Sequence, residues 1–238
     1  MNISYSAPVG IILSGESGLL YGKPAFGSAL NVFVKAHISE GTSKSVSRFY
    51  SLVVQEVEKV SKKKLDKDFH KKISVSFPDG IPLDFEGIEA AEIVAVTALV
   101  CDLLFNKSTS QEEINKIAFH VHKNIRRHVS GMYTSLSSFG GIIYYRKEFE
   151  FLKGIYKLSY KIPKDIEKDL RINFSYPADP YIDQPKNAEK ILSDQEKMTK
   201  RAIVAIIKED AKLFFDQFPP DEKKDYPFSQ SFDGVVKE

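Results

Sequence analysis

The sequence of 238 residues has no tryptophan, a single cysteine and no excess of either charge. One cysteine, Cys101, excludes an internal disulfide. Residues 1–5 lack the basic start and apolar run of a signal peptide, so we expect a cytoplasmic protein. The 34 basic and 32 acidic residues give a net charge of +2. Because nucleic acids are bound by clustered basic side chains, this balance argues against a nucleic-acid partner.

The sequence also has no long apolar run that is free of charge. Its most apolar stretch, residues 88–105, contains Glu89, Glu92 and Asp102, and carboxylates are costly in lipid. We therefore expect no transmembrane segment and no membrane partner. The rest is ordinary for a globular protein, with 42% hydrophobic and 28% charged residues, and the length suits one large domain or two small ones.

Both hydrophobic periods occur along the chain, which predicts an α+β fold. Apolar alternation and short apolar runs predict strands at residues 10–13, 29–38, 73–77, 141–145, 154–162 and 170–174. Helical spacing predicts helices at residues 46–60, 87–105, 110–126 and within 187–216. The third of these starts well, because Ser110 can cap it and Glu113 follows three residues on. The second is apolar on all sides and should be the central buried helix.

The composition of the chain changes after residue 176. Pro177, Pro180 and Pro185 lie within nine residues, which predicts a turn-rich connection. We divide the chain into an N-terminal domain, residues 1–165, and a partial, mostly helical C-terminal domain, residues 166–238. The last 20 residues are polar and should be frayed.

Two segments resemble the motifs of a known family. Residues 6–25 read SAPVGIILSGESGLLYGKPA, and residues 130–141 read SGMYTSLSSFGG. The first is similar, without a gap, to the opening motif of the GHMP small-molecule kinases, and especially of the mevalonate kinases, S-A-P-G-K-x-I-L-x-G-E-H-x-x-x-Y-G-K-P-A. The second resembles the family's S-G-x-D-N-A-x-S-T-Y-G-G. Two ungapped matches at the family's separation identify the chain as a member of this superfamily.

The resemblance implies a GHMP kinase fold, with an N-terminal domain like the second domain of ribosomal protein S5 and a ferredoxin-like C-terminal part. We expect that part to be shortened or remodelled, because the glycine-rich third motif is missing. The implied reaction is transfer of the ATP γ-phosphate to the hydroxyl of a small molecule, with Mg²⁺, in the formation of isoprenoid precursors. Glu16 is the implied catalytic residue that survives. The resemblance also implies a substrate cleft that contains Ser17, Tyr21, Lys23, Ser130 and Gly131.

Four polar positions of the family motifs carry other residues here. Gly10 stands in place of the lysine that approaches the transferring phosphate, and Ser17 in place of a histidine. Tyr133 stands in place of the aspartate taken as the base, although tyrosine titrates near 10. His122 replaces the metal-binding glutamate, although magnesium prefers oxygen ligands. Phosphoryl transfer depends on cations around the phosphate, so these changes should impair it.

The phosphate-binding loop is altered as well. The resemblance places it at the start of the helix at 87–105, over Gly87, Glu89, Ala90 and Ala91. The family has small residues and hydroxyls there, which let backbone N–H groups and the helix N-terminus hold phosphate. Carboxylates surround the start of this helix in our sequence, at Asp84, Glu86, Glu89 and Glu92. We expect this acidic mouth to repel a triphosphate.

The sequence therefore predicts a mevalonate-kinase-like protein that is catalytically impaired or inactive. Two alternatives stay open: an active small-molecule kinase with relocated catalytic groups, or a non-catalytic binding or regulatory subunit that forms a homodimer or pairs with an active homologue. An active enzyme needs a cation near Tyr133, and the candidates are Lys23, Arg126 and Arg127. We expect no metal site, because His120 and His122 point in different directions on one helix.

Overall fold

The computed structural model describes residues 3–38, 47–65, 73–105, 109–126, 128–147, 153–172, 174, 180–218 and 226–238. Its centre is an antiparallel sheet in the order β5-β4-β2-β1-β8, with β3 paired to the last four residues of β2, from Lys35 to Ile38. The strands are β1 (Ser4–Ser14), β2 (Ala25–Ile38), β3 (Ile73–Ser76), β4 (Ile142–Lys147), β5 (Lys153–Leu158) and β8 (Val236–Lys237). A short 3₁₀ helix, η1 (Glu16–Tyr21), joins β1 to β2.

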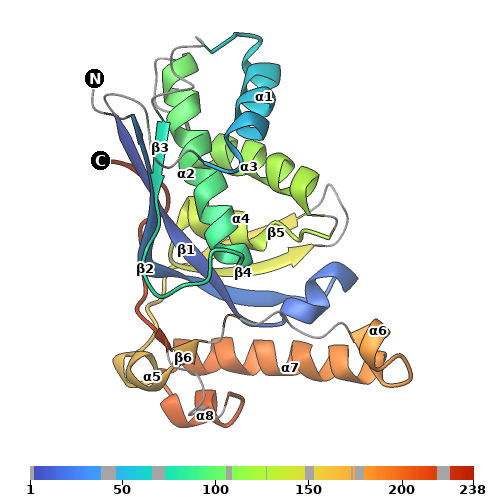
Figure 1. Ribbon diagram of the computed structural model, residues 1–238. Helices are drawn as coiled ribbons and strands as arrows, with labels where there is room; N and C mark the ends of the chain where they lie inside the picture. Colours follow the sequence, from blue (N-terminus) through green and yellow to red (C-terminus); the bar gives the residue numbers. More distant parts are fainter. Residues whose placement is uncertain are drawn as a thin grey trace.

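Four helices gather on one side of the long β1–β2 pair (Figure 1). They are α1 (Tyr50–Ser61), α2 (Glu86–Phe105), α3 (Gln111–Ile125) and α4 (Met132–Phe139). α2 packs on β1 and β2 and contacts the other three helices, and it is buried along nearly its whole length, as its uniformly apolar sequence predicts. α3 begins as predicted, with the Ser110 hydroxyl accepting a hydrogen bond from the Glu113 N–H. No helix in the described part of the chain is long and apolar enough to cross a membrane.

The later elements lie at the η1 end of the β1–β2 pair (Figure 1). They are α5 (Lys164–Asp169), β6 (Arg171–Ile172), α6 (Pro180–Asp183), α7 (Ala188–Ile207), α8 (Ala211–Phe215) and β7 (Tyr226–Pro227). α7 packs against β1, β2 and η1, and a buried hydrogen bond of 2.8 Å joins Ser14 of β1 to Thr199 of α7. In the described chain β6 pairs with β7, so Arg171–Ile172 form a strand within the range predicted at 170–174, while residue 173 lies outside the described residues.

The prediction of a frayed end is wrong for residues 226–238. β8 pairs with β1 at Tyr5 and Ser6, and Phe228 and Val235 are buried. The backbone also approaches α4 closely: a Cβ on Gly234 would lie 2.0 Å from the Ser138 carbonyl oxygen. The side chains here are polar, but the backbone groups find partners in the sheet, and polarity alone does not report that pairing. Residues 219–225 lie outside the described chain.

Candidate functional site

Four elements and the residue that follows one of them bring polar side chains together at one place. Glu16 opens η1, the start of α2 supplies Glu86 and Glu89, the last turn of α3 supplies His122, Arg126 follows that helix, and Tyr133 lies in the first turn of α4. We call these six residues the carboxylate cluster: Glu16, Glu86, Glu89, His122, Arg126 and Tyr133. Glycine makes two of the helix starts possible, because Gly15 before η1 and Gly131 before α4 have φ of 88° and 91°.

Glu16 and Tyr133 are joined directly. The Tyr133 hydroxyl donates to Glu16 Oε1 at 2.5 Å. Burial raises the pKa of Glu16 from its ordinary 4.5 to about 7, and the hydrogen bond from Tyr133 opposes this rise. Two positions that the sequence singled out separately, 117 residues apart, thus form one contact. The Glu16 carboxyl group therefore changes protonation near neutral pH.

Glu86 and His122 form the interior of the cluster. Burial raises the pKa of Glu86 to about 7, and the neighbouring charges of Glu16 and Glu89 add to this rise while Arg126 opposes it. His122 is fully buried, and its Nε2 lies 4.0 Å from Glu86 Oε1. Burial lowers the pKa of His122 to about 4, so the imidazole is neutral. Neither ring nitrogen has a hydrogen-bond partner among the described residues.

Two of the four carboxylates predicted to form an acidic mouth at the start of α2 are paired with arginines inside the protein. Arg126 Nε donates to Glu89 at 2.6 Å. Glu92 is fully buried and accepts hydrogen bonds from the Ser47 hydroxyl and the Arg48 backbone N–H and guanidinium. Glu89 and Glu92 are thus each held by partners from elsewhere in the chain, which the local sequence does not reveal. Of the three predicted cations, Arg126 joins the cluster, and Arg127 lies outside the described residues.

The implied phosphate-binding loop is closed by packing against β1 and by its own backbone hydrogen bonds. The backbone N–H groups of Ile88 and Glu89 donate to the Phe85 carbonyl, so they do not point at open space. Gly87 is buried against β1, where a Cβ would lie 2.3 Å from the Gly10 carbonyl oxygen. Ala90 and Ala91 are fully buried in the core. The glycine at position 87 therefore serves the contact between α2 and β1.

An aromatic cluster, which the sequence analysis missed, lies beside this loop. The ring of Phe85 meets Tyr133 edge-on, with centroids 5.7 Å apart, and meets Phe174 at 4.9 Å. Phe174 in turn packs on Tyr226 at 5.2 Å. These four residues come from four distant parts of the chain, so no local pattern could have indicated their contact. Their rings help to exclude water from Tyr133, which is 5% exposed.

Position 10, which the resemblance assigns to the family lysine, is closed by α4. A Cβ on Gly10 would lie 2.7 Å from Leu136 Cβ and 3.4 Å from the Tyr133 carbonyl oxygen. A longer side chain at position 10 would need α4 to move. The sequence showed the loss of the charge, and the structure adds that the space for it is filled.

The remaining residues of the predicted cleft lie apart from the cluster or support the fold. Tyr21 packs on Tyr181 of α6 with ring centroids 4.6 Å apart, and Lys23 forms an ion pair of 3.5 Å with Glu196 of α7. Ser17 is half-buried on η1. The Ser130 hydroxyl accepts a hydrogen bond from the Met132 N–H, so this serine and Gly131 start α4.

No group of three or more acidic, histidine or cysteine side chains in the described chain is arranged to hold a metal ion. His120 is half exposed and shares a hydrogen bond of 3.4 Å with Glu56 of α1. His122 faces Glu86 instead, so the two histidines do not converge.

The chain is similar in sequence to several mevalonate kinases. No family model matches the chain. The chain is 26% identical to a mevalonate kinase of Thermococcus sibiricus, over 88% of the chain and 71% of that protein. It is 28% identical to a mevalonate kinase of Pyrococcus abyssi, over 85% of the chain and 69% of that protein. It is 32% identical to a mevalonate kinase of Thermococcus gammatolerans over 62% of the chain and 52% of that protein.

The fold is shared with solved kinases at lower identity. The crystal structure of the Methanococcus jannaschii mevalonate kinase superimposes with a TM-score of 0.67, over 91% of the chain and 77% of that structure, at 17% identity. The Streptococcus pneumoniae phosphomevalonate kinase gives 0.54, over 91% and 76%, at 15% identity.

Proposed function

Because the chain belongs to the GHMP kinase superfamily, close to the mevalonate kinases, we propose that it is a non-catalytic member that acts by binding and does not transfer phosphate from ATP. The observation that carries the proposal is the closed state of the implied phosphate loop. The N–H groups of Ile88 and Glu89 bond to Phe85, and Gly87 packs on the backbone of Gly10. A phosphate needs such groups free at a helix start.

The residues present do not fit magnesium-bound ATP. The first carboxylates of α2, Glu86 and Glu89, already face the positive end of the helix dipole. His122 offers neutral ring nitrogens in place of the carboxylate oxygens that magnesium prefers. Position 10 holds neither a cation nor room for one.

The test is a titration calorimetry experiment on the full chain with Mg-ATP, together with a coupled assay of ADP formation in the presence of mevalonate. We expect no dissociation constant below about 1 mM and no ADP formation above the background. A mevalonate kinase treated identically is the positive control. Binding tighter than about 1 mM together with mevalonate-dependent ADP formation would refute the proposal.

A second candidate function, a kinase with relocated catalytic groups, is favoured by one contact. Glu16 has a pKa of about 7 and accepts a short hydrogen bond from Tyr133, which suits a group that exchanges protons near neutral pH. If the coupled assay detects turnover, Glu16→Gln should abolish it, whereas His120→Gln, on the exposed side of α3, should not.

A binding role requires a partner, and we propose a second copy of the chain or an active homologue in addition to a small-molecule ligand. Light scattering after size-exclusion chromatography measures the mass directly. A mass of 26.9 kDa at all concentrations, unchanged when an active mevalonate kinase is added, would contradict both protein partners.

A further inference from the structure

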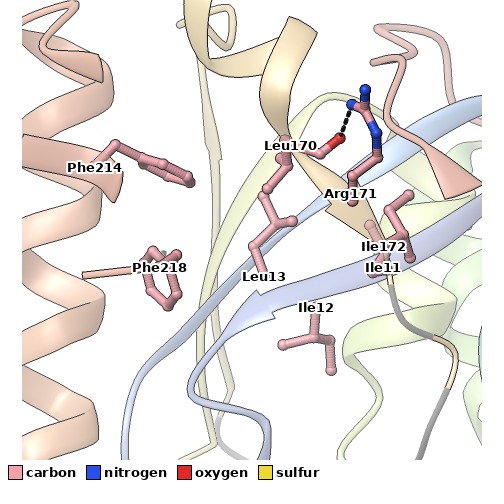
Figure 2. A pocket seen from close by; sticks show the side chains of 8 residues that line it. All are labelled: Ile11, Ile12, Leu13, Leu170, Arg171, Ile172, Phe214 and Phe218. Atoms are coloured by element: carbon pink, nitrogen blue, oxygen red, sulfur yellow. Dashed lines mark hydrogen bonds between the residues drawn. The ribbon is translucent and has the colours of Figure 1, made fainter. Parts of the chain in front are cut away.

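Two hollows in the described part of the chain differ in what they can bind. The smaller one, of about 110 Å³, lies between β1 and the C-terminal elements. Figure 2 shows its Arg171 guanidinium directed away from the apolar side chains and bonded to the Leu170 carbonyl oxygen, so this charge is not offered to a ligand in the pocket. The larger one, of about 550 Å³, lies between α7 and the β4–β5 pair and is open to solvent.

The larger hollow, which we call the β5 groove, is almost wholly apolar. Its lining residues are Tyr144, Tyr156, Leu158, Lys200, Ile203 and Val204. Tyr156 is 59% exposed and Val204 is 41% exposed, and the next turn of α7 adds Ile207 at 44%. Lys200, the charged residue among those that line the groove, is paired with Glu196 at 2.7 Å. Exposed apolar side chains that gather in a groove indicate an interaction surface.

The β5 groove lies at an edge of the central sheet. β5 is the last strand of the order, and in the described chain it pairs with β4 alone. Lysine side chains often protect such an edge from pairing with other strands. Here Lys157 instead donates to the Phe139 carbonyl of α4 at 2.6 Å. Lys153 lies over the Phe119 ring of α3. Both lysines thus occupy the helix-covered face, while Tyr156 lies on the face toward α7.

The sequence of β5 is suited to pairing with a second copy of itself. When two identical antiparallel strands are related by a two-fold axis, the residue on the axis faces its own copy. An axis at Tyr156 therefore sets the two Tyr156 rings together and Ile155 opposite Lys157. An axis at Ile155 would set Lys153 opposite Lys157. Like charges directly opposite are destabilising, so of the two registers that overlap most of β5, the one at Tyr156 is favoured.

We propose that two copies of the chain pair through the β5 edge, antiparallel and with a two-fold axis at Tyr156, so that the sheet continues from one copy into the other and the two β5 grooves join. The inference rests on the binding role proposed above, because it names the surface that a second copy would use. A strand edge with a groove is a small interface, so we expect a weak dimer with a dissociation constant of about 10 μM.

The first test is light scattering of the full chain at concentrations from about 1 to 100 μM. We expect the mass to rise from 26.9 kDa toward twice this value. Tyr156→Lys places two like charges on the axis and should keep the mass at 26.9 kDa. Val60→Lys is the matched control, because this residue of α1 is 54% exposed and lies outside the β5 groove, and it should associate as the wild type does.

Two results of this experiment would overturn the inference. If Tyr156→Lys associates as strongly as the wild type, the chain pairs through another surface. If the wild type stays at 26.9 kDa and gains mass only when an active mevalonate kinase is added, the partner is an active homologue and the chain does not pair with itself. Neither result bears on the titration with Mg-ATP, so the absence of phosphate transfer is tested separately.

The second test locates the axis. In Tyr156→Cys the two thiols should lie opposite each other with Cβ atoms about 5 Å apart, which a disulfide can bridge after a small shift. Air oxidation with copper phenanthroline should give a covalent dimer on a non-reducing gel, whereas Val60→Cys should stay monomeric. The native Cys101 is buried and should not react. Equal cross-linking of the two variants would overturn the axis at Tyr156.

Discussion

Glu86 provides a direct test of the electrostatics of the carboxylate cluster. Its side chain is 15% exposed, and burial, together with the charges of Glu16 and Glu89, raises its pKa from 4.5 to about 7. The folded protein therefore holds this proton more tightly than the unfolded chain does between these two pH values. Glu86 favours the folded state fully below pH 4.5, and this stabilisation is lost as the pH rises through 7. The difference between the two pKa values corresponds to about 3 kcal/mol in the free energy of unfolding.

The variant Glu86→Gln keeps the shape of the side chain and cannot ionise. We expect it to equal the wild type in stability at pH 4 and to exceed it by up to about 3 kcal/mol at pH 8. Urea unfolding of both proteins at intervals between pH 4 and pH 8 measures this difference, since the midpoints convert to free energies through the slope m. The gain should develop between pH 5 and pH 7.

Glu89→Gln is the matched control, one turn along the same helix. Its carboxylate accepts the 2.6 Å hydrogen bond from Arg126, so we expect this variant to lose stability at pH 8. The reasoning is refuted if Glu86→Gln leaves the pH profile of the wild type unchanged, or if it is the less stable protein at pH 8.

Two further substitutions test the packing around the site by urea unfolding at pH 7, and a third tests the C-terminal segment by hydrogen exchange. Arg126→Met leaves Glu89 buried without its partner and should cost about 2 kcal/mol, with Arg126→Lys recovering part of it; an unchanged midpoint would show that the pair contributes nothing. Gly10→Ala should cost about 1 to 3 kcal/mol because its methyl group meets Leu136, and a double variant with Leu136→Ala should cost less than the two single changes combined. Gly234→Ala places a methyl group against a backbone carbonyl of α4 and should raise the rate of amide hydrogen exchange in residues 226–238. The same exchange rates in the variant and the wild type would show that this contact does not hold residues 226–238 in place.

Local pattern predicted most of the elements. The apolar run of α2, the Ser110 cap of α3 and the alternation at β3 each depend on residues within a few positions of one another, and all three occur in the structure. β1 begins at Ser4, six residues before the predicted strand, because its first half is paired with β2 and β8. α4, with three serines and a threonine, has weak helix propensity and owes its form to burial on β1 and α2.

The candidate site also divides into features that the sequence determines and features that only the folded structure decides. The sequence alone determined the identities of Gly10, Tyr133 and His122, and the resemblance assigns these positions to charged groups of the family. It could not show that Leu136 fills the space beside Gly10, or that Arg126 neutralises Glu89. Such contacts join residues far apart in the chain, and only the packing of the helices on the sheet brings them together. The pKa values near 7 of two glutamates follow from burial, which is likewise a property of the folded chain.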